Sequence, residues 1–172
     1  LPILGMPRRE TDRFGWLREN QPDLVKALLL KGADPNARIG KNFPTYDYAP
    51  IARSIGNDHP QLSMVGITPY MLAAAAGDVA LMRTLVEGRG DPKLQTPEKI
   101  TGMMVAAGFG AERNMRNEEK ALEALKLAVD LGGDVNETKE DGRTALHAAA
   151  YMGWNSVIEF LASKGANLDA KD

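Results

Sequence analysis

The sequence predicts an all-α fold in which helix-turn-helix units stack side by side. Three observations lead to this prediction. An apolar helical stripe ending at a glycine-containing turn recurs four times, a short threonine-to-glycine motif precedes three of these stripes, and the last two stripes lie 33 residues apart. One such unit is too small to bury its apolar face alone, so we expect neighbouring units to share one continuous core.

The four stripes carry leucine, valine and alanine at helical spacing, followed by a glycine turn and a polar loop. They occupy residues 24–36, 81–92, 124–136 and 157–169. The loops are separated by steps of 57, 43 and 33 residues, counted at the equivalent positions Asp34, Asp91, Asp134 and Asn167. The last step equals a known helical-repeat length of about 33 residues. The two longer steps therefore indicate insertions of 24 and 10 residues.

The motif before the stripes appears in residues 66–77, 100–110 and 142–153. It resembles the ankyrin-repeat pattern Gly-x-Thr-Pro-Leu-His-x-Ala-Ala-x-x-Gly, and the resemblance covers about residues 22–172 apart from the insertions. The third copy departs from the pattern only by Ala145 in place of proline. The second copy is the most divergent, with lysine for the glycine and Gly102 for the proline. The resemblance implies an ankyrin-repeat solenoid with two inter-repeat insertions.

Local chemistry agrees with a helix that begins at each motif threonine. The hydroxyl of Thr68 can cap free backbone N–H groups, and Pro69 follows at the first helical position, where its missing N–H costs nothing. The alanine pairs are small enough for two helices to approach closely. Glycine suits the left-handed residue that ends the first helix of each repeat. These glycines are Gly77, Gly110 and Gly153.

We expect a single ankyrin-repeat domain over residues 1–172, and we expect it to be a fragment of a longer array. Residues 11–20 either form the first helix of the first repeat or belong to a loop, with the true first helix lying upstream. The predicted parts are a partial first repeat (1–37), an insertion (38–63), a repeat (64–94), a repeat (95–136) with an insertion (111–120), and a repeat (137–172).

The two insertions differ in composition. The first is rich in proline and aromatic residues, which favours an extended, ordered loop over a helix. It is either a contact surface for a partner, since long loops are often functional, or a decoration that folds back on neighbouring repeats. The second is charged with mixed sign, and we expect a solvated loop that leads into a helix from about Glu118. The array with its divergent insertions resembles bacterial ankyrin proteins more than idealised eukaryotic ones, so we expect a bacterial-type array.

Composition excludes several classes of protein. The net charge of −2 offers no broad basic field for phosphates, so we expect no nucleic-acid partner. The absence of cysteine excludes a disulfide scaffold, a thiolate metal site and a cysteine nucleophile. No apolar run reaches the roughly 18 residues needed to span a bilayer, so we expect no membrane insertion.

The sequence offers little that could carry catalysis or bind a metal. His147 lies at the histidine of the ankyrin motif, where the resemblance implies a structural hydrogen bond to neighbouring backbone. His59 follows Asp58 in the first insertion, but two adjacent residues in a loop are weak evidence for a metal site. We expect no enzyme activity, no catalytic residue, no metal and no cofactor.

The resemblance implies a concave face, built from loop tips and first helices, that binds another protein. We expect a scaffold, adaptor or accessory subunit of a multiprotein assembly; the alternative is a structural spacer or stabilising module within a longer polypeptide. Aromatic residues and methionine are good interface anchors. The candidate binding residues are Ala76, Phe109, Glu140, Asp141, Arg143, Tyr151, Met152 and Trp154 on the repeats, and Phe43, Tyr46 and Tyr48 in the first insertion.

Overall fold

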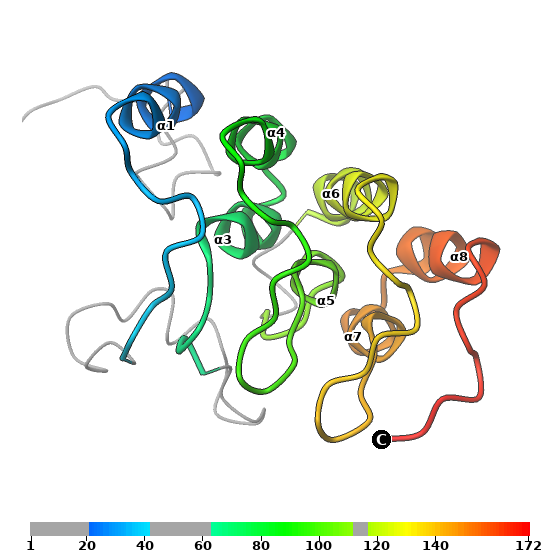
Figure 1. Ribbon diagram of the computed structural model, residues 1–172. Helices are drawn as coiled ribbons and strands as arrows, with labels where there is room; N and C mark the ends of the chain where they lie inside the picture. The colour runs from blue at the N-terminus through cyan, green and yellow to red at the C-terminus, as the bar shows by residue number, and fades with distance from the viewer. Residues whose placement is uncertain (1–20, 42–62, 112–116) are drawn as a thin grey trace, which may run out of the picture.

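A computed structural model describes residues 21–41, 63–111 and 117–172 (Figure 1). Within these ranges the chain forms helices and turns and no β-strand, which confirms the predicted all-α fold. The described helices are α1 (Gln21–Leu30), α3 (Pro69–Ala76), α4 (Val79–Glu87), α5 (Gly102–Ala106), α6 (Glu118–Asp130), α7 (Ala145–Met152) and α8 (Asn155–Ser163).

The helices form a two-layered stack. One row holds α1, α4, α6 and α8, and the other holds α3, α5 and α7, with the connecting loops extending on the side away from the first row (Figure 1). Each of α3, α5 and α7 packs on the helix that follows it, and both rows pack in register with the next repeat. The apolar side chains between the helices form one core that runs through the stack, as the sequence predicted.

Threonine caps the first helix of each complete repeat, as predicted. The hydroxyl of Thr68 accepts a hydrogen bond from the backbone N–H of Met71 at 3.3 Å, and that of Thr101 does so from Met104 at 3.2 Å. At Thr144 the motif histidine takes part, because Nδ1 of His147 accepts from the backbone N–H of Thr144 at 3.2 Å. These bonds occupy N–H groups that have no partner inside the helix.

The predicted glycine end of the first helix is confirmed in two repeats and displaced in the third. Gly77 and Gly153 are left-handed, with φ of 66° and 70°. Gly110 is also left-handed at 72°, but α5 has already ended at Ala106. The reason is Gly108, whose φ is 103° and whose added Cβ would lie 2.5 Å from Cγ of Met152. The chain leaves the helix early where the neighbouring repeat packs against its backbone.

The first insertion is attached at the tip of an inter-repeat loop whose base is unchanged. In the two later loops, one backbone hydrogen bond joins Thr96 to Ile100 and another joins Lys139 to Arg143. The same bond joins Ile39 N to Ile67 O at 3.1 Å, and Gly66 N donates back to Ile39 O at 2.8 Å. Two residues fill the tip of each later loop, whereas residues 40–65 fill this one. The extra residues therefore lie between Ile39 and Gly66.

The second insertion is partly helical. Residues 111–116 connect Gly110 to the cap Asn117, and 112–116 lie outside the described residues. The helix begins at Glu118 as predicted, and α6 has 13 residues where α4 and α8 have 9. Its extra turn holds the adjoining repeat, since Oε1 of Glu118 accepts from the backbone N–H of Ser156 at 2.8 Å and from its hydroxyl at 2.7 Å. This contact caps α8, whose own N-cap residue makes no side-chain cap bond.

Candidate protein-binding surface

The loop tips and first helices place the sequence-predicted residues in different environments. On the repeats, Ala76, Glu140, Asp141 and Tyr151 are exposed and Arg143 is half-buried. Phe109, Met152 and Trp154 are buried, with only 5–7% of each residue exposed. Three further candidates, Phe43, Tyr46 and Tyr48, lie outside the described residues, as does His59.

Three of these candidates lie at equivalent positions of successive repeats, and they do not form an open row. Ala76, Phe109 and Met152 occupy equivalent positions, but only Ala76 is exposed. The guanidinium of Arg143 lies over the ring of Phe109, 5.0 Å from its centroid. Met152 and Trp154 both approach Gly108 of the preceding repeat, since a Cβ there would lie 2.5 Å from Met152 Cγ and 3.1 Å from Trp154 Cζ3. These side chains therefore pack between neighbouring repeats and stabilise the stack.

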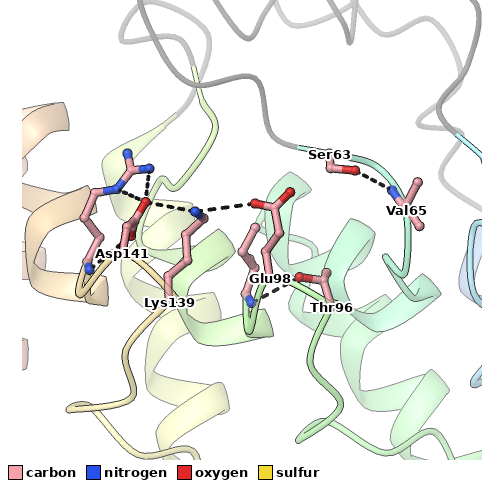
Figure 2. A network of polar contacts seen from close by, with 8 residues as sticks. Ser63, Val65, Thr96, Glu98, Lys139 and Asp141 are labelled. Atoms are coloured by element: carbon pink, nitrogen blue, oxygen red, sulfur yellow. Dashed lines mark hydrogen bonds and ion pairs between the residues drawn. The ribbon is translucent and has the colours of Figure 1, made fainter. Parts of the chain in front are cut away.

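Two adjacent loop tips are joined by a network of charges (Figure 2). The ammonium of Lys139 lies between Glu98 of one loop and Asp141 of its own loop, at 3.4 and 2.9 Å. Arg143 donates to Oδ2 of Asp141 from Nε at 3.0 Å and from Nη2 at 2.6 Å. The backbone N–H of Glu140 donates to Glu98 O at 3.3 Å. The last two repeats therefore present their tips as one connected unit.

The two adjacent acids of this loop tip, Glu140 and Asp141, differ in their surroundings. The hydrogen bonds from Arg143, helped by Lys139, hold the pKa of Asp141 well below its usual range. Asp141 is thus committed to the network as a carboxylate. Glu140, one residue earlier, is exposed, and its side chain projects from a backbone that is hydrogen-bonded to the neighbouring loop. The backbone of Glu140 is thus held by the neighbouring loop while its side chain is exposed.

The first loop is tied to the next at its base. Nη1 of Arg38 donates to the carbonyl of Gln95 at 2.7 Å, and the amide of Gln95 donates to Oε1 of Glu137 at 3.3 Å. Burial is the main reason why the pKa of Glu137 is raised, and the bond from Gln95 opposes that shift. Within the loops themselves, Val65 N donates to Oγ of Ser63 and Ile100 N to Oγ1 of Thr96 (Figure 2). Side-chain hydrogen bonds therefore stabilise all three described inter-repeat loops.

One exposed apolar residue on the same side was missed by the sequence reasoning. Leu72 is 41% exposed on α3 and lies four residues before Ala76, which places both on one face of the helix. Tyr151, 39% exposed, lies near the end of α7, the corresponding helix two repeats further on. The signal for Leu72 was available, because helical spacing from Ala76 points directly to it.

The described residues include neither a metal-binding cluster nor a helix suited to a membrane. Among them, no three histidine, aspartate or glutamate side chains come together in a way that could hold a metal ion. No helix in the described part of the chain is both long and apolar enough to cross a membrane. Nδ1 of His147 faces Thr144, with 3.0 Å to its hydroxyl as well as the backbone bond. This histidine stabilises the start of α7.

Comparison with known proteins agrees with the fold. The family model described as "Ankyrin repeats (3 copies)" matches residues 70–172. Myotrophin of Xenopus tropicalis is 52% identical over 46 residues, which is 27% of this chain and 39% of that protein. The E3 ubiquitin-protein ligase KEG of Arabidopsis thaliana is 24% identical over 88% of this chain and 10% of its own length. The Ankyrin repeat and KH domain-containing protein mask-1 of Caenorhabditis elegans is 28% identical over 87% of this chain and 7% of its own length.

Proposed function

Because the chain belongs to the ankyrin-repeat family, we propose that it is a non-catalytic module that binds another protein, as a scaffold, adaptor or accessory subunit of a larger assembly. Ankyrin repeats are generally protein-interaction modules. The chain spans 10% or less of the length of KEG and mask-1, which are two different kinds of larger protein. The proposal therefore concerns the module, and it leaves the partner unnamed.

The observation that carries the proposal is the connected pair of loop tips before α7, together with an exposed tyrosine in the last turn of that helix. The network around Lys139 fixes Asp141 and Arg143 and leaves Glu140 exposed. A surface that is already ordered loses little conformational freedom when a partner binds, which favours affinity. Tyrosine is enriched among the residues that dominate binding energy. We therefore assign the partner-binding surface to Glu140 and Tyr151, with Leu72 and Ala76 further along the same row of helices.

The proposal gives the chain no catalytic residue, no cofactor and no nucleic-acid partner. Its net charge of −2 provides little attraction for phosphate backbones. The bacterial character suggested by the insertions stays a prediction, and the relatives named above, from a plant, a nematode and a frog, do not support it.

Two matched charge reversals test the proposal within one repeat. Glu140→Lys changes the exposed loop tip, and Glu159→Lys makes the same change on the exposed side of α8. The full-length protein and both variants are purified under gentle conditions, and the proteins that co-purify are quantified. We expect Glu140→Lys to lose a stoichiometric partner that Glu159→Lys keeps. Equal retention by both variants would remove the loop tip from the binding surface.

An apolar pair separates the binding role from the structural alternative. Tyr151→Ala removes the exposed ring on α7, whereas Leu168→Ala removes a side chain of the last loop that is 68% exposed. We expect only the first to weaken partner retention while both keep the thermal stability of the parent. If neither the parent nor any variant retains a partner at any salt concentration, the spacer or stabilising module becomes the better description.

A further inference from the structure

Two of the described loops hold the following repeat through an asparagine side chain. Nδ2 of Asn36 donates to the carbonyl of Arg89 at 3.2 Å, and Oδ1 of Asn36 accepts from the backbone N–H of Asp91 at 2.8 Å. Asn136 makes the same pair of bonds to the fourth repeat, at 3.0 and 2.8 Å. One amide thus binds two backbone groups of the neighbouring loop, which fixes the distance and the orientation between adjacent repeats.

Lys93 stands at the equivalent position between the second repeat (64–94) and the third (95–136). It lies two residues after Asp91, as Asn36 lies two residues after Asp34. The backbone turn is also the same, because Lys93 N donates to Oδ1 of Asp91 at 2.9 Å and the corresponding bond of Asn36 measures 2.8 Å. The Lys93 ammonium reaches the third repeat, 3.0 Å from where a Cβ on Gly132 would lie, but within the described loops it makes neither of the two bonds that asparagine makes. An ammonium has no acceptor atom, so this boundary lacks the two-point attachment.

The third and fourth repeats are held together on two sides besides their asparagine contact. At the loop tips, Lys139 pairs with Glu98 at 3.4 Å. At the start of the helices, Glu118 of α6 accepts two hydrogen bonds from Ser156 of α8. Contacts at the tips and at the helices together resist bending between these two repeats.

Between the second and third repeats, the close contacts lie on the side of the first helices and loops. A Cβ on Gly102 of α5 would lie 2.6 Å from the Tyr70 ring of α3, and Arg38 of the first loop donates to the carbonyl of Gln95 at 2.7 Å. In the row that holds α1, α4, α6 and α8, by contrast, α4 contacts α6 less extensively than it contacts α1. The missing asparagine attachment therefore falls where the packing of this row is also thinnest.

We propose that the boundary between the second and third repeats is a hinge. The contact between α3 and α5 is its pivot, and α4 and α6 approach or separate in the other row (Figure 1). Such a motion between two rigid parts changes the curvature of the stack. Leu72 on α3 and Tyr151 on α7 lie on opposite sides of the boundary, so the hinge changes their separation. The hinge goes beyond the proposed binding function and does not depend on it.

Paired spin labels test the hinge, because the chain has no cysteine of its own. Arg83, Lys126 and Glu159 lie at equivalent positions of α4, α6 and α8, each eight residues before the shared loop position. Full chains with Arg83→Cys/Lys126→Cys or Lys126→Cys/Glu159→Cys are labelled with nitroxides. Dipolar broadening of the EPR spectrum in frozen solution then gives the spread of label-to-label distances. We expect the spread for 83 and 126 to be about twice that for 126 and 159.

Two substitutions of Lys93 test the cause of the motion. Lys93→Asn supplies the missing amide in a backbone turn that already matches, whereas Lys93→Ala removes the charge and supplies no amide. We expect only Lys93→Asn to narrow the spread for 83 and 126 to that of the other pair. We also expect it to slow hydrogen exchange at the Asp134 amide, the donor equivalent to Asp91 N, by about tenfold.

Three outcomes would overturn the proposal. Equal spreads for the two label pairs in the parent would show that the boundary is no more flexible than its neighbour. Slower exchange at Asp134 in Lys93→Asn with an unchanged spread would show that the attachment forms without restraining any motion. Equal narrowing by Lys93→Ala would assign the effect to the lysine charge and remove the missing amide as its cause.

Discussion

Tyr70 and Gly102 depart from the ankyrin pattern together, and their contact predicts a coupled effect on stability. Tyr70 stands where the motif has leucine, and Gly102 stands where the next motif has proline. A Cβ on Gly102 would lie 2.6 Å from Cε1 and 3.0 Å from Cδ1 of the Tyr70 ring, which is 2% exposed and has no room to move outward. Gly102→Ala therefore forces overlap in the core.

The expected magnitude follows from two opposing contributions. Overpacking of a filled core costs about 1–3 kcal/mol. Replacing a helical glycine by alanine gains at most about 1 kcal/mol. The overlap is therefore the larger contribution, and we expect Gly102→Ala to lower the free energy of unfolding by about 1–2 kcal/mol. For a chain of this size, each kcal/mol corresponds to about 2–4 °C in Tm.

Equilibrium denaturant unfolding of four proteins measures the coupling: the parent, Gly102→Ala, Tyr70→Leu, and the double variant. Leucine at position 70 removes the ring, so the same alanine should be neutral or stabilising in that background. A coupling free energy above about 1 kcal/mol is expected for residues in contact. If alanine at position 102 has the same effect with either residue at position 70, the steric reasoning is refuted.

Four further predictions follow from single features. Tyr70→Phe should stabilise the folded protein by about 1 kcal/mol at neutral pH, because the Tyr70 hydroxyl is buried without a hydrogen-bond partner. Burial also raises the pKa of Tyr70 to about 12, so the parent should lose stability between pH 10 and 12 while the variant does not. Lys99→Gly should raise Tm by relieving a left-handed φ of 61°, a gain of about 1 kcal/mol; an unchanged Tm would contradict this. Asp141→Asn should cost less than about 1 kcal/mol at pH 7. Because the pKa of Asp141 is depressed in the folded state, that difference should persist at pH 4 and shrink only at lower pH in an acid titration of stability. Replacing residues 40–65 by Asn-Gly should keep the stack folded and stabilise it by about 1 kcal/mol through a shorter closed loop; a loss of stability would show that the insertion packs on the repeats.

The sequence was sufficient for features that depend on local chemistry. A threonine before an apolar run predicts a capped helix start, and Thr68 and Thr101 both cap the expected N–H groups. The start of α6 was predicted at about Glu118, where the charged insertion leads into the helix of the third apolar stripe, and α6 begins there. These features depend on residues a few positions apart, so one sequence contains all the information they need.

Features that depend on contact between repeats could not be predicted from the sequence. The early end of α5 arises because Gly108 meets Met152 and Trp154 from the next repeat, and no local pattern reports that contact. The same contact makes Met152 and Trp154 part of the core, although both looked like interface anchors. Sequence also offered no means to tell which acid of Glu140 and Asp141 would pair internally, because that choice depends on where Lys139 and Arg143 point.

The attachment of the first insertion at a loop tip has a consequence for how the stack assembles. Between α1 and α3 lie 38 residues, whereas 14 separate α4 from α5 and α6 from α7. Closing the longer connection costs about 1 kcal/mol more chain entropy. Leu24 and Leu28 of helix α1 are also largely exposed. Within the described residues, fewer apolar contacts of α1 therefore offset the entropy cost of closing this connection. The amide hydrogens of α1 should therefore exchange with solvent through local opening, while the three helix pairs from α3 to α8 remain assembled.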